Sequence, residues 1–229
     1  MAIPKPDDLG REKTLLALYL LGRKFPYSKF NRRVTLAVAL ALTAFCYLQW
    51  ENTPLLSAAL RKYAEISLSF CTSILGFLIA GFTVFVTVTK LDIFTTMAKI
   101  EFESTGESYL KYNLVQFMLV FSHYIAFLFV CICFALFFQP QGLVSILVDK
   151  ALSSSNFSWK ADLFYKAPVT FVMIVFGAWS IYLVLLLKSF VYNTFQVITT
   201  TVRWELELQE KSSTAIVSEL ASPRGEINP

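Results

Sequence analysis

Charged side chains are absent from four long apolar stretches of this 229-residue sequence. The stretches cover residues 34–50, 66–89, 114–138 and 169–187, and none of them contains Asp, Glu, Lys or Arg. A helix needs roughly 20 consecutive apolar residues to cross the hydrocarbon core of a bilayer, and these stretches meet or approach that length. Hydrophobic residues make up 56% of the chain. The sequence therefore predicts an all-α, polytopic membrane protein with four transmembrane helices.

The signatures of common enzyme sites are missing too. The sequence has no Gly-rich phosphate loop, no HExxH and no G-x-S-x-G. Its single histidine, His123, has no carboxylate beside it in the apolar stretches, so neither a metal site nor a catalytic acid–base pair is expected. We therefore expect no enzyme activity, no cofactor and no bound metal. Of the three functions that we consider for this chain, a membrane enzyme or carrier that uses His123 is the weakest hypothesis.

Cysteine is scarce and confined to the apolar stretches. Cys46, Cys71, Cys131 and Cys133 lie inside them or at their edges, without the spacing of a metal site. We interpret them as small packing residues and expect no disulfide.

The positive charges predict the topology. Lys and Arg number eight before the first stretch, three between the second and third, and four after the fourth, against two and three in the other loops. By the positive-inside rule, both termini and the loop at 90–113 face the cytoplasm of an inner membrane. The net charge of +4 is explained in this way, and no direct nucleic-acid binding is expected.

The chain divides into four predicted regions. They are a cytoplasmic segment at 1–33 with a short interfacial helix, a four-helix transmembrane domain at 34–187, a cytoplasmic helical extension of the fourth span at 188–210, and a flexible tail at 211–229. The short helix at 14–22 either lies in the headgroup layer or packs under the bundle. Cations placed to bind lipid headgroups are Arg11, Lys13, Arg23, Lys24, Arg32 and Arg33.

Small and hydroxyl residues recur every third or fourth position through the second span. This small-residue stripe consists of Ser69, Ser73, Gly76, Ala80, Thr83 and Thr87. Small residues let helices approach closely in lipid, so the stripe predicts a tight helix–helix contact. Two interpretations stay open: packing within one bundle, or a central axis in a homo-oligomer where the hydroxyls of the stripe line a water path.

Polar residues also share one face of the third span. Tyr112, Gln116 and His123 fall within about 40° of one another on a helix. A polar group inside the membrane is a functional candidate by default. The alternative is structural, with a neutral imidazole bonded to Gln116 or to a hydroxyl of a neighbouring helix.

Two amphipathic helices are predicted on the cytoplasmic side. The first places Ile93, Phe94, Met97 and Ile100 on one face, with Asp92 as its N-cap and a break at Gly106. The second extends the fourth span and repeats Val191, Phe195, Ile198 and Val202. Both faces are predicted to contact a soluble cytoplasmic protein.

Two short segments carry a family resemblance. GFLIAGFTVFVT at 76–87 and ESYLKYN at 107–113 resemble small bacterial four-span membrane proteins linked to antiviral defence, such as the membrane component of the Kiwa system. The resemblance implies an inner-membrane homo-oligomer that senses envelope disturbance or assembles with a cytoplasmic effector, and it assigns no site residues.

The leading hypothesis is accordingly a non-enzymatic, oligomeric inner-membrane sensor or scaffold in contact with lipid and with a cytoplasmic protein. The alternative is a channel or pore-forming effector lined by the small-residue stripe.

Overall fold

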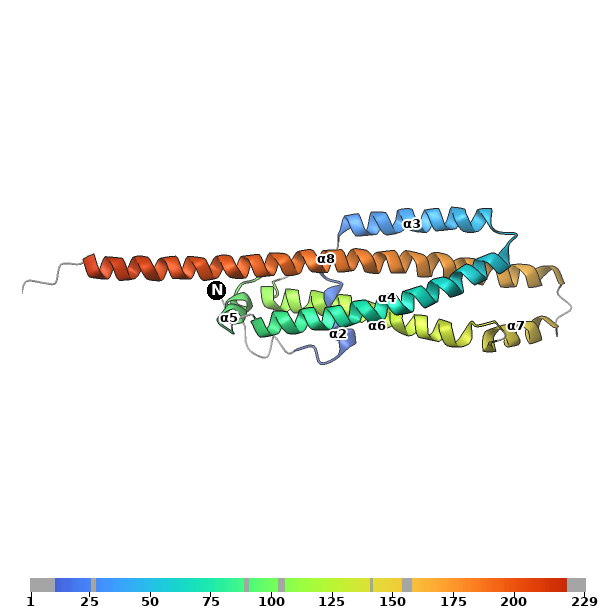
Figure 1. Cartoon of the computed structure of the whole chain (residues 1–229), viewed down its shortest axis with the longest axis horizontal. Coiled ribbons are helices and arrows are strands. Elements are labelled where there is room, and N and C mark those ends of the chain that lie inside the picture. The colour runs from blue at the N-terminus through green and yellow to red at the C-terminus, as the bar shows by residue number, and fades with distance from the viewer. Residues whose placement is uncertain are drawn as a thin grey trace, which may run out of the picture. The chain divides into compact units, whose positions relative to one another are not determined.

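The computed structural model describes residues 11–25, 28–88, 91–102, 106–140, 142–153 and 158–221, and most of these are helical. The helices are α2 (Leu15–Gly22), α3 (Lys29–Leu48), α4 (Thr53–Val88), α5 (Leu91–Lys99), α6 (Tyr109–Phe137), α7 (Leu143–Ser153) and α8 (Ser158–Ala221) (Figure 1). Within the described part, the sole β feature is an isolated bridge between Glu101 and Ser108. The all-α prediction is confirmed. The chain forms two units, Met1–Lys188 and Ser189–Pro229.

Three helices are long and apolar enough to cross a membrane. These candidate spans are Thr53–Thr87 in α4, Tyr109–Phe137 in α6 and Lys166–Thr214 in α8. They contain the fourth stretch expected from the sequence, and the second and third except for the last two residues of the second and the last residue of the third. The length and hydropathy of these three helices thus indicate a membrane-embedded protein.

Helix α3 is not among the three candidate membrane spans. Its first two turns carry Lys29, Arg32 and Arg33, and the apolar residues at 34–48 that follow extend about 22 Å at 1.5 Å per residue. The hydrocarbon core is about 30 Å thick. The span at 34–50 is helical up to Leu48, but a fourth crossing stays a prediction.

Helix α6 is central to the first unit. It contacts α2, α4 and α5, and its aromatic side chains pack against α8. Tyr124 is fully buried and donates a hydrogen bond to the carbonyl oxygen of Leu183 at 3.0 Å. The ring of Phe127 stacks on Phe176, with 4.6 Å between centroids, and meets Trp179 edge-on. Aromatic contacts therefore hold the α6–α8 interface.

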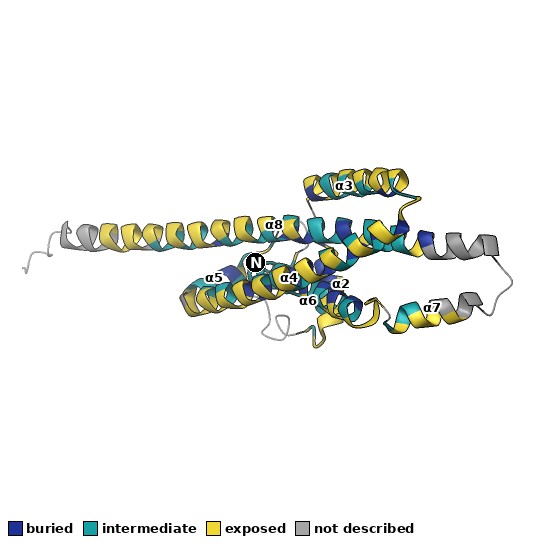
Figure 2. Ribbon diagram, turned by 45° about the vertical axis from the view of Figure 1, so that its right-hand side comes forward, coloured by how far each residue is buried: buried dark blue, intermediate teal, exposed yellow. Residues whose placement is uncertain are grey.

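Helix α3 runs beside α8 (Figures 1 and 2). Three contacts mark the length of the pairing: Asn31 Nδ2 donates to the carbonyl oxygen of Leu185 at 3.3 Å, Leu42 fills the space where a Cβ at Gly177 would lie, and Lys166 pairs with Glu51 at 3.2 Å. Gly177 thereby permits a close approach of the two helices.

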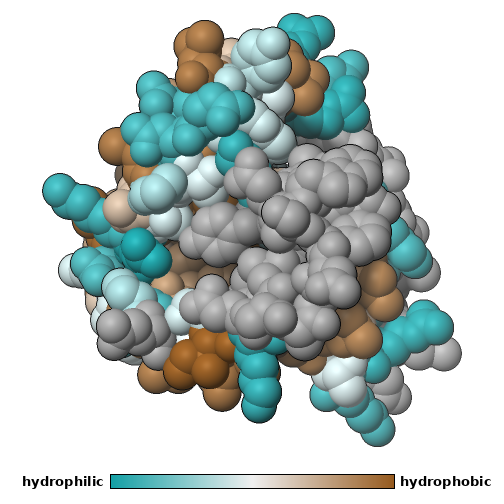
Figure 3. Space-filling model, turned by 90° about the vertical axis from the view of Figure 1, so that its right-hand side faces the viewer, coloured by the Kyte–Doolittle hydropathy of each residue, from teal (hydrophilic) through white to brown (hydrophobic). Residues whose placement is uncertain are grey.

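The outward surfaces of the helices are apolar. Leu36 and Leu40 on α3 and Phe129 on α6 are each at least 60% exposed, and exposed residues follow the flanks of α3 and α4 (Figure 2). Seen from the end at which α7 lies, the described surface mixes hydrophilic and hydrophobic side chains (Figure 3). Apolar flanks with a mixed end are typical of helices leaving a bilayer.

The helices extend beyond the predicted boundaries. Helix α4 begins at Thr53 rather than at residue 66, and α8 begins at Ser158 with Pro168 inside it. The predicted fourth span begins at residue 169, directly after that proline, which removes a helical hydrogen bond. The helix nevertheless continues through Pro168. Helix α7 also occupies part of the predicted outer loop, and its signal was the i, i+3, i+4 spacing of Leu143, Ile146 and Leu147.

The predicted flexible tail at 211–229 is wrong over its first part. Helix α8 continues to Ala221, and the hydroxyls of Ser213 and Thr214 donate to carbonyls one turn earlier at 2.9 Å. Ser and Thr suggested a tail, yet their side chains can bond within a helix. Residues 222–229 lie outside the described part.

The aromatic interface gives a stability prediction. Replacing Phe127, which is 1% exposed, by Ala should lower the free energy of unfolding by about 3 kcal/mol, because a large buried ring is lost and a cavity remains. Thermal or denaturant unfolding of the purified protein in detergent would measure this loss.

Phe129 on the same helix is the matched control, since it is 66% exposed. Phe129→Ala should change the unfolding free energy little. Equal losses in the two variants would contradict the described packing of α6.

Candidate functional site

The small-residue stripe lies entirely on the exposed face of α4. Each of its six members, Ser69, Ser73, Gly76, Ala80, Thr83 and Thr87, is exposed. A Cβ built on Gly76 meets nothing within 4 Å. The structure brings the stripe together as one continuous face, but no other helix that the structure describes covers it.

The other face of α4 makes the contacts within the bundle. Its buried residues recur every three or four positions and are Leu56, Leu60, Ala64, Ser67, Cys71, Leu75 and Leu78. Further along the helix, Phe82 stacks on Phe117 of α6. The interpretation that the stripe packs within its own bundle is therefore not what the structure shows. Both faces of α4 have helical spacing; the buried face includes four leucines, whereas the stripe contains no large side chain.

The hydroxyls of the stripe bond within their own helix. Ser73 donates to the carbonyl oxygen of Ser69 at 3.1 Å, Thr83 to Ile79 at 2.9 Å, and Thr87 to Thr83 at 2.8 Å. These three hydroxyl protons are thus satisfied without a neighbouring helix. The hydroxyl oxygens keep lone pairs that can accept a hydrogen bond.

His123 lies between two tyrosine rings. Tyr19 of α2 and Tyr182 of α8 meet its imidazole edge-on, with centroids 5.5 and 5.7 Å away. Tyr182 precedes Lys188 by six residues, so this site lies about 9 Å along α8 from that cation. A hydrogen bond between His123 and Gln116 is not among those formed by the described residues. Aromatic contacts take its place.

The three predicted polar residues of α6 do not form one site. Gln116 is half-buried, His123 contacts the two tyrosines, and Tyr112 belongs to a separate aromatic cluster with Phe25 and Phe102. The rings of Tyr112 and Phe102 stack with 4.1 Å between centroids. Sequence spacing placed these residues on one helical face, but different neighbours cover different levels of it.

A buried ion cluster ties the N-terminal segment to α6. Lys111, with only 7% of its side chain exposed, pairs with Glu12 at 3.0 Å and with Glu107 at 3.1 Å. We name these three residues the Lys111 ion cluster. No prediction from the sequence included this cluster. Glu107 could have been found from its i, i+4 spacing, whereas Glu12 is almost 100 residues away and gives no local signal.

Two positions were predicted for α2, in the headgroup layer or packed under the bundle, and each describes one side of this helix. Leu21 and Gly22 are buried, and Gly22 lies close to Leu119 of α6. Leu16 and Leu20 on the same helix point outward and are 68% and 52% exposed. The predicted headgroup cations are all exposed: Arg11, Lys13, Arg23, Lys24, Arg32 and Arg33. One side of α2 thus packs on α6, and the other side is exposed, as a position in the headgroup layer would require.

The predicted partner-facing surface of α5 points inward. Met97 is 1% exposed, and Phe94 meets Phe85 of α4 edge-on; Ile93 and Ile100 are half-buried. The amphipathic pattern therefore marks a face that packs on this chain's own helices. Asp92 lies inside the first turn of α5 rather than at a cap, and Gly106 does adopt a positive φ of 70°.

The apolar face of the α8 extension is exposed within the second unit. Val191, Phe195, Ile198 and Val202 are each at least half exposed. The threonines at 199–201 do not interrupt the helix, and Thr199 donates to the carbonyl oxygen of Phe195 at 2.8 Å. The apolar face of the α8 extension is therefore exposed, whereas the predicted partner-facing surface of α5 is covered.

The described residues contain no cluster of three or more His, Cys, Asp or Glu that could hold a metal ion. All four cysteines are free thiols; Cys46, Cys71 and Cys131 are buried, and Cys133 is half-buried, as expected for packing residues.

Comparison with known proteins finds no matching protein family, no similar curated sequence and no similar solved structure.

The Lys111 ion cluster predicts a change in protease sensitivity. Glu12→Gln removes one of the two carboxylates that neutralise a buried ammonium, which should loosen α2 from α6. Trypsin cleavage after Arg23 or Lys24 in detergent-solubilised protein should become about tenfold faster, because a cost near 1.4 kcal/mol shifts the open population by that factor.

Glu101→Gln provides the control, since Glu101 is an exposed carboxylate in the segment that precedes α6. Its cleavage rate should match that of the wild type. If Glu12→Gln also leaves the rate unchanged, the ion cluster does not hold the N-terminal segment.

Proposed function

We propose that this protein is a non-enzymatic, oligomeric inner-membrane sensor or scaffold, which assembles through the small-residue stripe and presents the α8 extension to a cytoplasmic partner. One observation carries the proposal. The stripe is exposed along its whole length on a helix whose opposite face is fully engaged in the chain's own core.

The length of the stripe fits a membrane interface. Ser69 and Thr87 are 18 residues apart, which corresponds to about 27 Å along a helix and nearly matches the hydrocarbon thickness. In lipid, helices gain no hydrophobic energy by associating, so close van der Waals contact has to supply the attraction. A face without large side chains allows that contact. Another copy of α4 is its simplest occupant.

The proposed topology has four spans with both termini in the cytoplasm. Its support comes from α3, which extends alongside α8 from the level of Leu185 to the level of Lys166. That part of α8 lies inside a candidate span. The cations at the start of α3 can reach lipid headgroups on flexible stems, which lets a short apolar segment cross.

The α8 extension supplies the surface for a soluble partner. Residues 189–221 would extend about 50 Å as a helix, and the apolar face from Val191 to Val202 is open. Such a face binds a complementary groove or helix through residues spaced at i, i+3 and i+4. A role in bacterial antiviral defence, with an effector in that position, rests on the family resemblance of 76–87 and 107–113 and is part of the proposal.

Assembly through the stripe is tested by Gly76→Leu. Gly76 is exposed, and a Cβ there has no atom of another described helix within 4 Å, so the larger side chain should leave the monomer fold intact and act on a second helix. We expect the wild-type chain to be an oligomer in nanodiscs and the variant to dissociate at least about tenfold more readily, given helix-packing energies of about 1–2 kcal/mol. Native mass spectrometry reads the subunit number directly.

Gly81→Leu is the matched control. Gly81 lies on the same helix, also has open space at its Cβ position and is not part of the stripe. It should leave assembly unchanged. A monomeric wild type, or a Gly76→Leu variant that assembles normally, would refute the proposed interface.

A channel is the second candidate function, favoured by the hydroxyl oxygens exposed along the stripe. In a ring of chains these oxygens would line a polar path. Thr83→Leu should then abolish ion flux in liposomes without changing the oligomer mass, whereas Val84→Leu at the adjacent exposed position should leave flux unchanged. Vesicles that stay tight with wild-type protein would exclude this function.

A further inference from the structure

An apolar cavity lies at the end of the first unit where α4, α6, α7 and α8 meet. Its volume is about 170 Å³. Leu60 of α4 and Phe134 of α6, both buried, line it together with half-buried Val144 of α7 and Val172 of α8. An apolar cavity of about 150 Å³ can hold a benzene-sized group, so this one can hold a segment of a hydrocarbon chain but not a whole lipid. Its occupant must extend beyond it.

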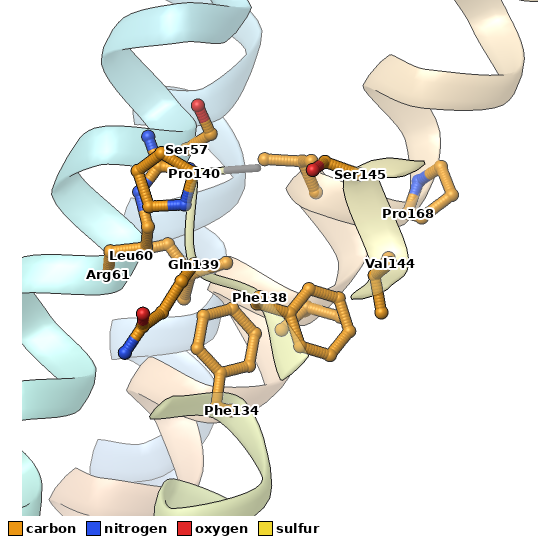
Figure 4. Close-up of a pocket in the computed structure, with 12 residues that line it drawn as sticks. Ser57, Leu60, Arg61, Phe134, Phe138, Gln139, Pro140, Val144, Ser145 and Pro168 are labelled. Atoms are coloured by element: carbon orange, nitrogen blue, oxygen red, sulfur yellow. The ribbon is translucent and has the colours of Figure 1, made fainter. Parts of the chain in front are cut away.

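The cavity opens at the level where the helices leave the candidate spans. Phe138, Gln139 and Pro140 line it immediately after the end of α6, and they are exposed, as is Pro168 of α8. Figure 4 shows the two phenylalanines below the cavity and Val144, Ser145 and Pro168 on the far side from Arg61. A chain that enters here would come from the adjacent lipid layer, and its head would stay at the boundary with water.

Among the described residues that line the cavity, Arg61 is the one cation. Its side chain is half-buried and lies beside Pro140 and Gln139 (Figure 4). Among the residues that the structure describes, Arg61 forms no ion pair, whereas Lys166 at the same end of the bundle pairs with Glu51. None of the described residues that line the cavity is a carboxylate. The site thus carries a partly desolvated positive charge beside apolar walls.

The hydroxyls at the cavity do not compete with Arg61 as anion donors. Ser57 donates to the carbonyl oxygen of Pro54 at 3.0 Å, and Ser145 donates to that of Gly142 at 2.9 Å. The guanidinium, by contrast, offers several N–H groups in a planar fork that matches the oxygens of a phosphate. An anionic head above an apolar chain complements both parts of this site.

We propose that this cavity binds an anionic phospholipid of the surrounding bilayer, with its phosphate on Arg61 and part of one acyl chain between Phe134 and Val172. The site shares no residue with the small-residue stripe, so it stands or falls independently of the assembly interface proposed above. It would place a specific lipid at the joint between α7 and the bundle, where the composition of the membrane can act on the protein.

Photo-crosslinking tests the site on the full chain in nanodiscs of dioleoylphosphatidylcholine. The probe is a phosphatidylglycerol that carries a diazirine in its acyl chain, and mass spectrometry maps the attachment point. We expect attachment at residues 57–61 or 134–144. Unlabelled phosphatidylglycerol should compete for the site about tenfold better than phosphatidylcholine, as expected for one added charge-assisted contact.

Three variants separate the two parts of the site. Arg61→Gln should lower crosslinking about tenfold and remove the preference for the anionic lipid, because the charged contact is lost. Lys62→Gln, at the neighbouring exposed position that does not line the cavity, should change neither. Val144→Phe should lower crosslinking by filling the cavity while Arg61 remains, and its melting temperature reports whether the fold is retained.

Several results would overturn the proposal. They are attachment elsewhere on the chain, equal competition by phosphatidylcholine, equal losses in Arg61→Gln and Lys62→Gln, or competition by oleate but not by phosphatidylglycerol. If Val144→Phe does not fold, Val172→Phe replaces it, and undiminished crosslinking in a folded cavity-filling variant would likewise refute binding in the cavity.

Discussion

The packing of aromatic side chains between α6 and the first half of α8 is the contact on which the rest of the first unit depends. Phe127 lies against Phe176 and Trp179, and Tyr124 closes the same interface with a hydrogen bond to a backbone carbonyl. Lipid tails are as apolar as these side chains, so burial alone stabilises such an interface little, and shape and specific polar contacts have to supply the rest. Helices α2, α4 and α5 then contact α6, and α3 pairs with α8.

The two faces of α4 differ in what they contact. One face presents Leu60, Leu75 and Leu78 to the core of its own chain, and the other presents the small-residue stripe with its hydroxyls bonded inward. The leucines fill space within the chain, while the small residues of the stripe leave room for a second backbone. A single helix can therefore contribute to the fold and to an assembly without a conflict between the two.

Polar groups in this unit are concentrated where a bilayer would end. Lys111 is neutralised by two glutamates near the start of α6, Lys166 is paired at the other end of the bundle, and His123 between them meets only aromatic rings among its described contacts. Charged groups are costly in hydrocarbon, so pairing at the boundary and aromatic contact at depth satisfy the same constraint. Among the described residues, Arg61 forms no ion pair, and for that reason we propose a lipid phosphate as its partner.

The sequence by itself determined that the chain is helical and where most helices lie, because helix formation and hydropathy are local properties. It predicted four membrane spans, and three of them lie in helices long and apolar enough to cross a membrane. It also located the stripe and the apolar face from Val191 to Val202 by spacing alone. Its errors at Pro168 and at 211–221 came from local breaking signals that these helices override.

Only the tertiary structure decided which face of each helix is covered. It turned the stripe outward and Met97 inward, and it joined Glu12 to Lys111 across almost the whole first half of the chain. The physical reason is that a membrane helix is apolar on every side. Hydropathy cannot distinguish a side chain that meets another helix from one that meets lipid, and that distinction comes from the fit between surfaces that lie far apart in the sequence.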